Sequence, residues 1–107
     1  MVTESVQRVV HEYLRAATRA GIPTRKAVLF GSQASGQAHS LSDIDLVILS
    51  PVLEPPRSHD VIAALWRLRI ETDSRIELVP CGEKEWETDD SRAVLEIARR
   101  NGTVIEA

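Results

Sequence analysis

The sequence has little of several residue types, and each shortage excludes a class of protein. A single cysteine, Cys81, allows neither an intramolecular disulfide nor a cysteine-bound metal cluster, which is typical of proteins in a reducing cytoplasm. No apolar run approaches the ~20 residues that a membrane-spanning helix needs. The first ten residues also lack the apolar segment of a signal peptide. We therefore expect a cytoplasmic protein without a membrane partner.

Positive charge is scarce as well. The chain has 13 Lys and Arg against 16 Asp and Glu, so its net charge of -3 creates no overall field that attracts nucleic acid. We expect no direct nucleic-acid partner, and a bound polyphosphate would need a local cradle or metal ions. The length of 107 residues predicts one domain over residues 1–107. If this chain is an enzyme, a partner or a large substrate must complete its site.

Hydrophobic periodicity predicts alternating helices and strands. Apolar residues recur at helical spacing from Val6 to Ala17, in a helix that Thr3 or Ser5 can cap and Gly21 can end. Strands are predicted at 26–30, 44–49, 75–79 and 103–105, with a short helix after residue 31, a long helix at 60–71 and a last helix from Thr88 or Asp90 to about 101. The side chains expected to face inward from the helix at 60–71 are Val61, Ile62, Leu65, Trp66 and Leu68. The predicted fold class is α/β, a small mixed β-sheet flanked by helices.

The most informative stretch connects the first two predicted strands. Gly31 and Ser32 follow the first strand directly, and Asp43 and Asp45 open the second strand ten residues later. Gly31 has no Cβ and lets the backbone approach a ligand, while Ser32 offers a hydroxyl and a backbone N–H at a predicted helix start, an arrangement that suits phosphate. Residues two apart on a strand point to the same side, so Asp43 and Asp45 form a carboxylate pair suited to Mg²⁺. Without a cation the two charges repel each other.

Glu77 is the candidate third carboxylate. It lies within the predicted strand at 75–79, which could neighbour the strands that carry the other site residues. Three carboxylates can hold two metal ions, one that activates an attacking hydroxyl and one that steadies a triphosphate. Glu77 could instead accept the proton of that hydroxyl. The competing interpretation is a surface glutamate on a half-exposed strand, because Glu77 alternates with Ile76 and Leu78.

These residues resemble the motif of the DNA polymerase β-type nucleotidyltransferase superfamily, whose minimal nucleotidyltransferases (MNT proteins) carry Gly-Ser, ten residues, and Asp-x-Asp. The match covers Gly31, Ser32, Asp43 and Asp45. The resemblance implies a polymerase β-like fold, triphosphate binding by Gly31 and Ser32, and metal binding by Asp43 and Asp45. It also implies Mg²⁺-dependent transfer of AMP from ATP to a hydroxyl of a partner. That partner would be a HEPN-type toxin, to which this chain would be the antitoxin and with which it would form a complex.

The sequence departs from the family pattern at two positions after the Gly-Ser pair. Gln33 and Ser35 stand where many relatives carry arginines. Either phosphate binding is weaker, or a nearby basic residue replaces the arginines; the candidates are Arg25, Lys26 and His39.

Two alternative functions remain open, and the acidic run has two interpretations. The chain could be a non-catalytic antitoxin that occludes its toxin, or a small-molecule transferase of the antibiotic-modifying type. The acidic run from Glu83 to Asp90 could be a docking patch for a basic partner, or a solvated loop before a helix. Cys81 has no base partner beside it and is expected to be a quiet thiol.

Overall fold

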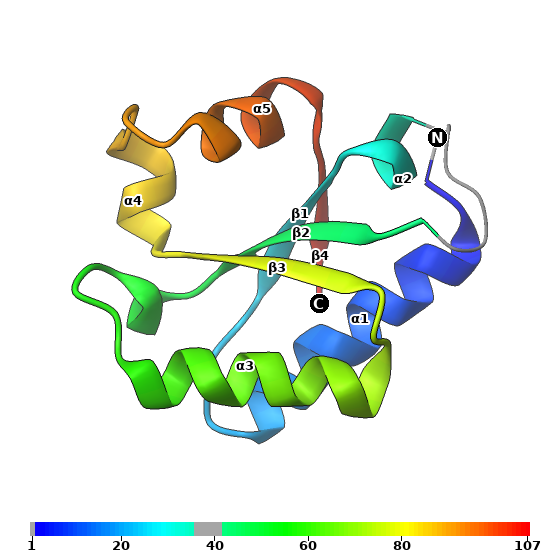
Figure 1. The fold of residues 1–107 in the computed structure, drawn as a ribbon, viewed down its shortest axis with the longest axis horizontal. Coiled ribbons are helices and arrows are strands. Elements are labelled where there is room, and N and C mark those ends of the chain that lie inside the picture. The colour runs from blue at the N-terminus through cyan, green and yellow to red at the C-terminus, as the bar shows by residue number, and fades with distance from the viewer. Residues whose placement is uncertain (1, 36–41) are drawn as a thin grey trace.

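A computed structural model describes residues 2–35 and 42–107 of the chain, and it contains a four-stranded sheet with helices on both faces (Figure 1). The strands lie in the order β3 (Ile76–Cys81), β2 (Ile44–Leu49), β1 (Lys26–Phe30) and β4 (Thr103–Glu106). β2 and β3 are parallel, whereas β1 is antiparallel to both β2 and β4. The prediction of a small mixed sheet flanked by helices is therefore confirmed.

One face of the sheet packs against the two long helices, α1 (Glu4–Arg19) and α3 (His59–Thr72) (Figure 1). α1 begins at its Thr3 cap, whose hydroxyl accepts a hydrogen bond from the Val6 N–H, and it is followed by Gly21 in a left-handed conformation. The Tyr13 hydroxyl donates a 2.7 Å hydrogen bond to the Leu65 carbonyl and so joins the two helices. The strand residues on this face are Ala27, Leu29, Ile44, Leu46, Ile48, Ile76, Leu78 and Ile105.

The other face is covered by α4 (Glu83–Thr88) and α5 (Ala93–Asn101). Its buried strand residues alternate with those of the first face; they are Val28, Val47, Leu49 and Cys81. Leu95 and Ala98 of α5 pack against them. No helix among the described residues is long and apolar enough to cross a membrane.

The segment from 83 to 92 differs from the prediction. It forms the separate helix α4, and the last helix begins at Ala93 instead of Thr88 or Asp90. Glu54 explains the difference, because its carboxylate accepts hydrogen bonds from the N–H groups of Lys84 (2.7 Å) and Glu85 (3.1 Å). This cap comes from a residue about 30 positions earlier, and the Glu85 carboxylate adds a local contact by accepting a hydrogen bond from the Gly82 N–H (3.0 Å).

Trp66 also departs from the prediction that it faces inward. Leu65 is fully buried, whereas Trp66 is 36% exposed. Successive residues of a helix are turned by about 100°, so a core that takes Leu65 and Leu68 turns Trp66 to the side. There the Trp66 ring stacks with the Arg69 guanidinium, which lies 4.9 Å from the ring centroid.

Candidate active site

The strand register places the Gly-Ser pair beside the aspartates. Phe30 at the end of β1 lies opposite Asp45 near the start of the antiparallel β2. Gly31 and Ser32 follow directly, and Ser32 begins the short helix α2 (Ser32–Ser35). The Gly-Ser pair and the two aspartates, which have ten residues between them in the sequence, therefore lie at one end of the sheet.

β3 adds Glu77 to the same end. Asp45 and Glu77 are register partners on the parallel strands β2 and β3. Both alternate in phase with Val47 and Val79, so both point to the face that carries α4 and α5. The prediction that the strand of Glu77 neighbours the strand of the aspartates is confirmed, although β3 does not contact β1.

Gly31 has a steric role beside Asp45. Its φ of +75° favours glycine, and a Cβ placed on Gly31 would collide with Oδ2 of Asp45. The missing side chain thus leaves the space that the Asp45 carboxylate occupies.

The three carboxylates interact electrostatically. Burial raises the pKa of Asp45, and the negative charges of Asp43 and Glu77 raise it further. Asp43 itself is exposed, and Asp45 is half-buried. The site therefore has an excess of negative charge that a bound cation would relieve.

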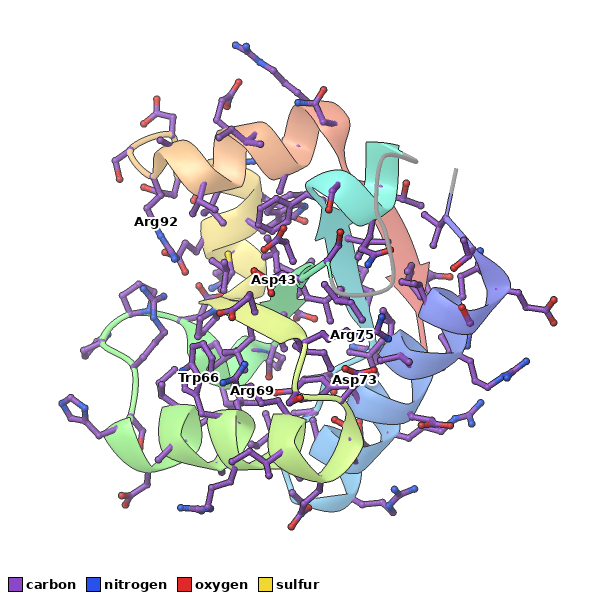
Figure 2. All side chains as sticks on the ribbon, turned by 45° about the vertical axis from the view of Figure 1, so that its right-hand side comes forward. Asp43, Trp66, Arg69, Asp73, Arg75 and Arg92 are labelled. Carbon is purple, nitrogen blue, oxygen red and sulfur yellow. The ribbon has the colours of Figure 1, made fainter. Side chains whose placement is uncertain are left out.

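Glu77 has a cationic neighbour that the sequence did not reveal. Its side chain is 47% exposed, and Oε1 lies 3.8 Å from Nη1 of Arg69 on α3. The same Arg69 nitrogen donates hydrogen bonds to the carbonyls of Ser74 (3.0 Å) and Ile76 (2.9 Å). Figure 2 shows Arg69 next to Trp66 on α3. Their i, i+3 spacing was the one available signal, since it puts an aromatic ring and a guanidinium on one side of a helix.

Asp73, which could have replaced Glu77 as the third acid, is engaged elsewhere. Its carboxylate accepts hydrogen bonds from the Arg75 backbone (2.9 Å) and guanidinium (2.8 Å); both residues are labelled in Figure 2. The side-chain hydrogen bond from Arg75 lowers the pKa of Asp73. This pair closes the turn into β3 and makes Asp73 a structural residue.

The donor chemistry of Asp43 and Asp45 fits a divalent cation. Both offer carboxylate oxygens, which Mg²⁺ prefers, and burial together with the negative charges of Asp43 and Glu77 raises the pKa of Asp45. Within residues 2–35 and 42–107, no three His, Cys, Asp or Glu side chains are gathered closely enough to form a metal-binding group. The aspartate pair is thus the candidate metal-binding pair, and the roles of Asp43, Asp45 and Glu77 as ligands all stay predictions.

The basic residues considered as replacements for the missing arginines lie elsewhere. Arg25 and Lys26 are at the start of β1, where Lys26 pairs with Leu49 and Glu106. Four residues of strand put Lys26 roughly 13 Å from Phe30, so these two cannot stand in for the arginines. His39 lies outside the described residues.

The acidic run does not form a uniform docking patch. Glu85 is only 8% exposed, and its carboxylate pairs with Arg57 (2.6 Å) and Arg92 (2.9 Å) and accepts a hydrogen bond from the Gly82 N–H (3.0 Å). Burial alone would raise the pKa of Glu85, but the hydrogen bonds and the two arginine charges lower it overall. Nearby, burial raises the pKa of the Cys81 thiol to about 12, which agrees with a quiet thiol.

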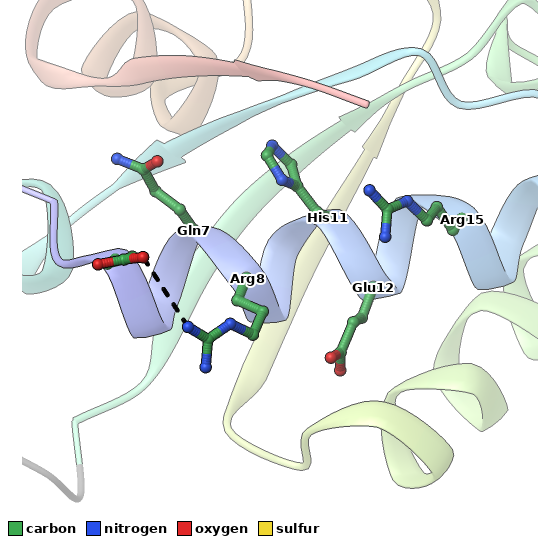
Figure 3. Close-up of a pocket in the computed structure, with 6 residues that line it drawn as sticks. Gln7, Arg8, His11, Glu12 and Arg15 are labelled. Carbon is green, nitrogen blue, oxygen red and sulfur yellow. Dashed lines mark ion pairs between the residues drawn. The ribbon is translucent and has the colours of Figure 1, made fainter.

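A hollow of about 380 Å³ lies on the exposed side of α1 (Figure 3). It is lined by Glu4, Gln7, Arg8, His11, Glu12 and Arg15. All six residues come from one helix on the opposite face of the sheet from Asp45, so this hollow does not belong to the carboxylate site.

Comparison with known proteins identifies the class of enzyme. A model of the family described as "Nucleotidyltransferase domain" matches residues 12–101. The chain belongs to this nucleotidyltransferase family. Gly31, Ser32, Asp43, Asp45 and Glu77 all lie within the matched range. Comparison with curated proteins finds no match.

Solved structures share the fold of this nucleotidyltransferase. A crystal structure from Sulfolobus solfataricus, provisionally assigned as a nucleotidyltransferase, superposes with a TM-score of 0.65 at 14% identity, over 94% of this chain and 78% of that one. A toxin–antitoxin crystal structure with AMP-PNP superposes with a TM-score of 0.62 at 24% identity, over 92% of this chain and 71% of that one. Both confirm the predicted fold.

Proposed function

We propose that this nucleotidyltransferase transfers AMP from ATP to a hydroxyl of a HEPN-type toxin and so acts as its antitoxin. The observation that carries the proposal is the close approach of Gly31 to Asp45, which brings the Gly-Ser loop beside the carboxylate pair. The similar toxin–antitoxin structure, which holds an ATP analogue, supports both the choice of nucleotide and the kind of partner.

Gly31 and Ser32 would bind the triphosphate. The Gly31 backbone has no side chain to keep a phosphate away, and Ser32 contributes its hydroxyl and N–H. α2 has only four residues, so its dipole is small and these local donors must supply most of the attraction.

Asp43 and Asp45 would hold Mg²⁺ through their carboxylate oxygens. When bound, the ion would neutralise the triphosphate and make the acceptor hydroxyl more acidic. Asp45 is fixed between Gly31 and its register partner Glu77, so the metal-binding oxygens are placed before substrate arrives. Glu77 is exposed enough to meet an acceptor and would take the hydroxyl proton as that oxygen attacks the α-phosphorus and pyrophosphate leaves.

Modification would inactivate a toxin that binds RNA. AMP adds bulk and negative charge, which repels an RNA backbone from the modified site. The net charge of -3 on this chain is compatible with a basic protein as acceptor.

Co-expression of this chain with the protein encoded beside its gene tests the proposal. Mass spectrometry of the neighbour should show a gain of one or more AMP units. The gain should be lost when Asp43→Asn and Asp45→Asn are introduced together. An unmodified neighbour that is still neutralised would instead favour antitoxin action by occlusion.

A further inference from the structure

Gln33 is the buried polar residue at the candidate active site that the proposed chemistry does not use. Its side chain is only 6% exposed, although it follows Ser32 on the short helix α2. The Nε2 of Gln33 donates a 3.3 Å hydrogen bond to the carbonyl of Ser42. Ser42 directly precedes Asp43. Gln33 therefore connects the Gly-Ser loop directly to the backbone segment that carries Asp43.

The two aspartates are held by different means. Asp45 lies within β2, where the ladders to β1 and β3 fix its backbone. Asp43 lies one residue before β2 and does not share those ladders. Its side chain is exposed, so packing does not fix it either. A contact at the Ser42 carbonyl is thus well placed to restrict the backbone of Asp43.

We propose that Gln33 is a positioning residue that holds Asp43 at the correct distance from Ser32 and Asp45. This inference rests on the proposed function, because it gives Gln33 a role toward the metal that Asp43 and Asp45 would bind. Residues behind metal ligands orient them, and their loss typically lowers metal affinity by about 10–100-fold.

The test measures Mn²⁺ binding by electron paramagnetic resonance on the full chain. Gln33→Met has nearly the same volume and no donor, and it should weaken Mn²⁺ binding about tenfold. Gln7→Met, at an exposed glutamine of α1, is the matched control and should bind Mn²⁺ like the wild type. If Gln33→Met does not fold, Gln33→Asn keeps the amide, shortens the side chain by one methylene and should give the same loss.

A second background separates positioning from a merely structural role. With Asp43→Asn present, Gln33→Met should weaken the remaining Mn²⁺ binding no further, because the ligand that Gln33 positions is gone. Equal Mn²⁺ affinity of the wild type and Gln33→Met, with only a lowered Tm, would overturn the role of Gln33 and leave the metal assignment intact. A wild-type chain that binds no Mn²⁺ would overturn both proposals.

Discussion

Asp45 and Glu85 lie at opposite ends of the sheet face that carries α4 and α5, and they are held in opposite ways. Glu85 is bracketed by Arg57 and Arg92, and its pKa is lowered. Burial raises the pKa of Asp45, and its charged neighbours Asp43 and Glu77 raise it further. Donors surround Glu85 and stabilise its charge, whereas like charges surround Asp45, as is common at functional sites. The difference separates the structural acid from the candidate catalytic acid without reference to any relative.

The largest effect on stability is expected at Glu85. Glu85→Gln leaves Arg57 and Arg92 without their counter-charge and should lower the free energy of unfolding by about 3 kcal/mol, the low end for a buried ion pair because both arginines are about a quarter exposed. Urea denaturation at pH 7 measures the change. Glu87→Gln, at an exposed position of the same helix, should change stability by less than about 0.5 kcal/mol. Equal effects of the two variants would remove Glu85 from its structural role.

A substitution at Glu77 tests whether the candidate active site includes this residue as well as Asp45. Glu77→Gln should reduce the rate of AMP transfer about 100-fold and change nucleotide affinity much less, as expected for an interaction made mainly in the transition state. Single-turnover kinetics with the co-purified neighbour give both quantities. Near-normal transfer would make Glu77 a surface partner of Arg69 and leave Asp43 and Asp45 as the only acids of the site.

Alanine substitutions at the two glycines with positive φ distinguish the cost of backbone strain from the cost of a clash with Asp45. Gly21→Ala meets no atom within 4 Å and should cost about 1–2 kcal/mol from its φ of +92° alone. Gly31→Ala should cost more, because its Cβ also collides with the Asp45 carboxylate. Thermal denaturation measures both variants. In an Asp45→Ala background the two glycine substitutions should cost the same, and a persistent excess at Gly31 would show that another contact causes it.

The pH dependence of stability should have opposite signs at the two acids. Because the folded-state pKa of Asp45 is raised above its ordinary value of 3.8, the ionised carboxylate lowers stability above that folded-state pKa. Asp45→Asn should therefore be more stable than the wild type at pH 7, and the gain should vanish as the pH falls below 3.8. The lowered pKa of Glu85 means that its contribution is present above its ordinary value of 4.5 and is lost as the pH falls through the folded-state pKa. As the pH falls from 7 to 3, the Tm of Asp45→Asn should approach the wild-type Tm from above, and the Tm of Glu85→Gln should approach it from below.

Local patterns predicted the parts of the fold that depend on local physics. The strand at 26–30 and the strand at 44–49 match exactly, because runs of branched apolar residues specify buried strands. The third strand is displaced, since it begins at Ile76 and continues through Pro80 to Cys81. α4 was missed because the Glu54 cap is distant in the sequence and the local Gly82–Glu85 contact lacks the Ser or Thr that marks a capping box.

The candidate site divides in the same way. The fixed spacing of Gly31, Ser32, Asp43 and Asp45 predicted the candidate site, and the strand register places Gly31 beside Asp45. The neighbours Arg69 and Gln33 emerge only when strands and helices are placed in space, because their contacts with Glu77 and Ser42 depend on side-chain reach across elements. The suggestion that Arg25 or Lys26 replaces the missing arginines fails for a related reason. Both residues are close to Gly31 in the sequence, but they lie at the opposite end of β1.

The central claim is that the uncompensated carboxylates at the Asp45 end bind a metal–nucleotide complex. Isothermal titration calorimetry of Mg·ATP tests it directly with the wild type and the Asp43→Asn, Asp45→Asn double variant. We predict that the wild type binds Mg·ATP, that the double variant binds it at least about 100-fold more weakly, and that the double variant is as stable as the wild type without metal or more so, because two repelling charges are gone. Equal Mg·ATP affinity of the two proteins would contradict the account.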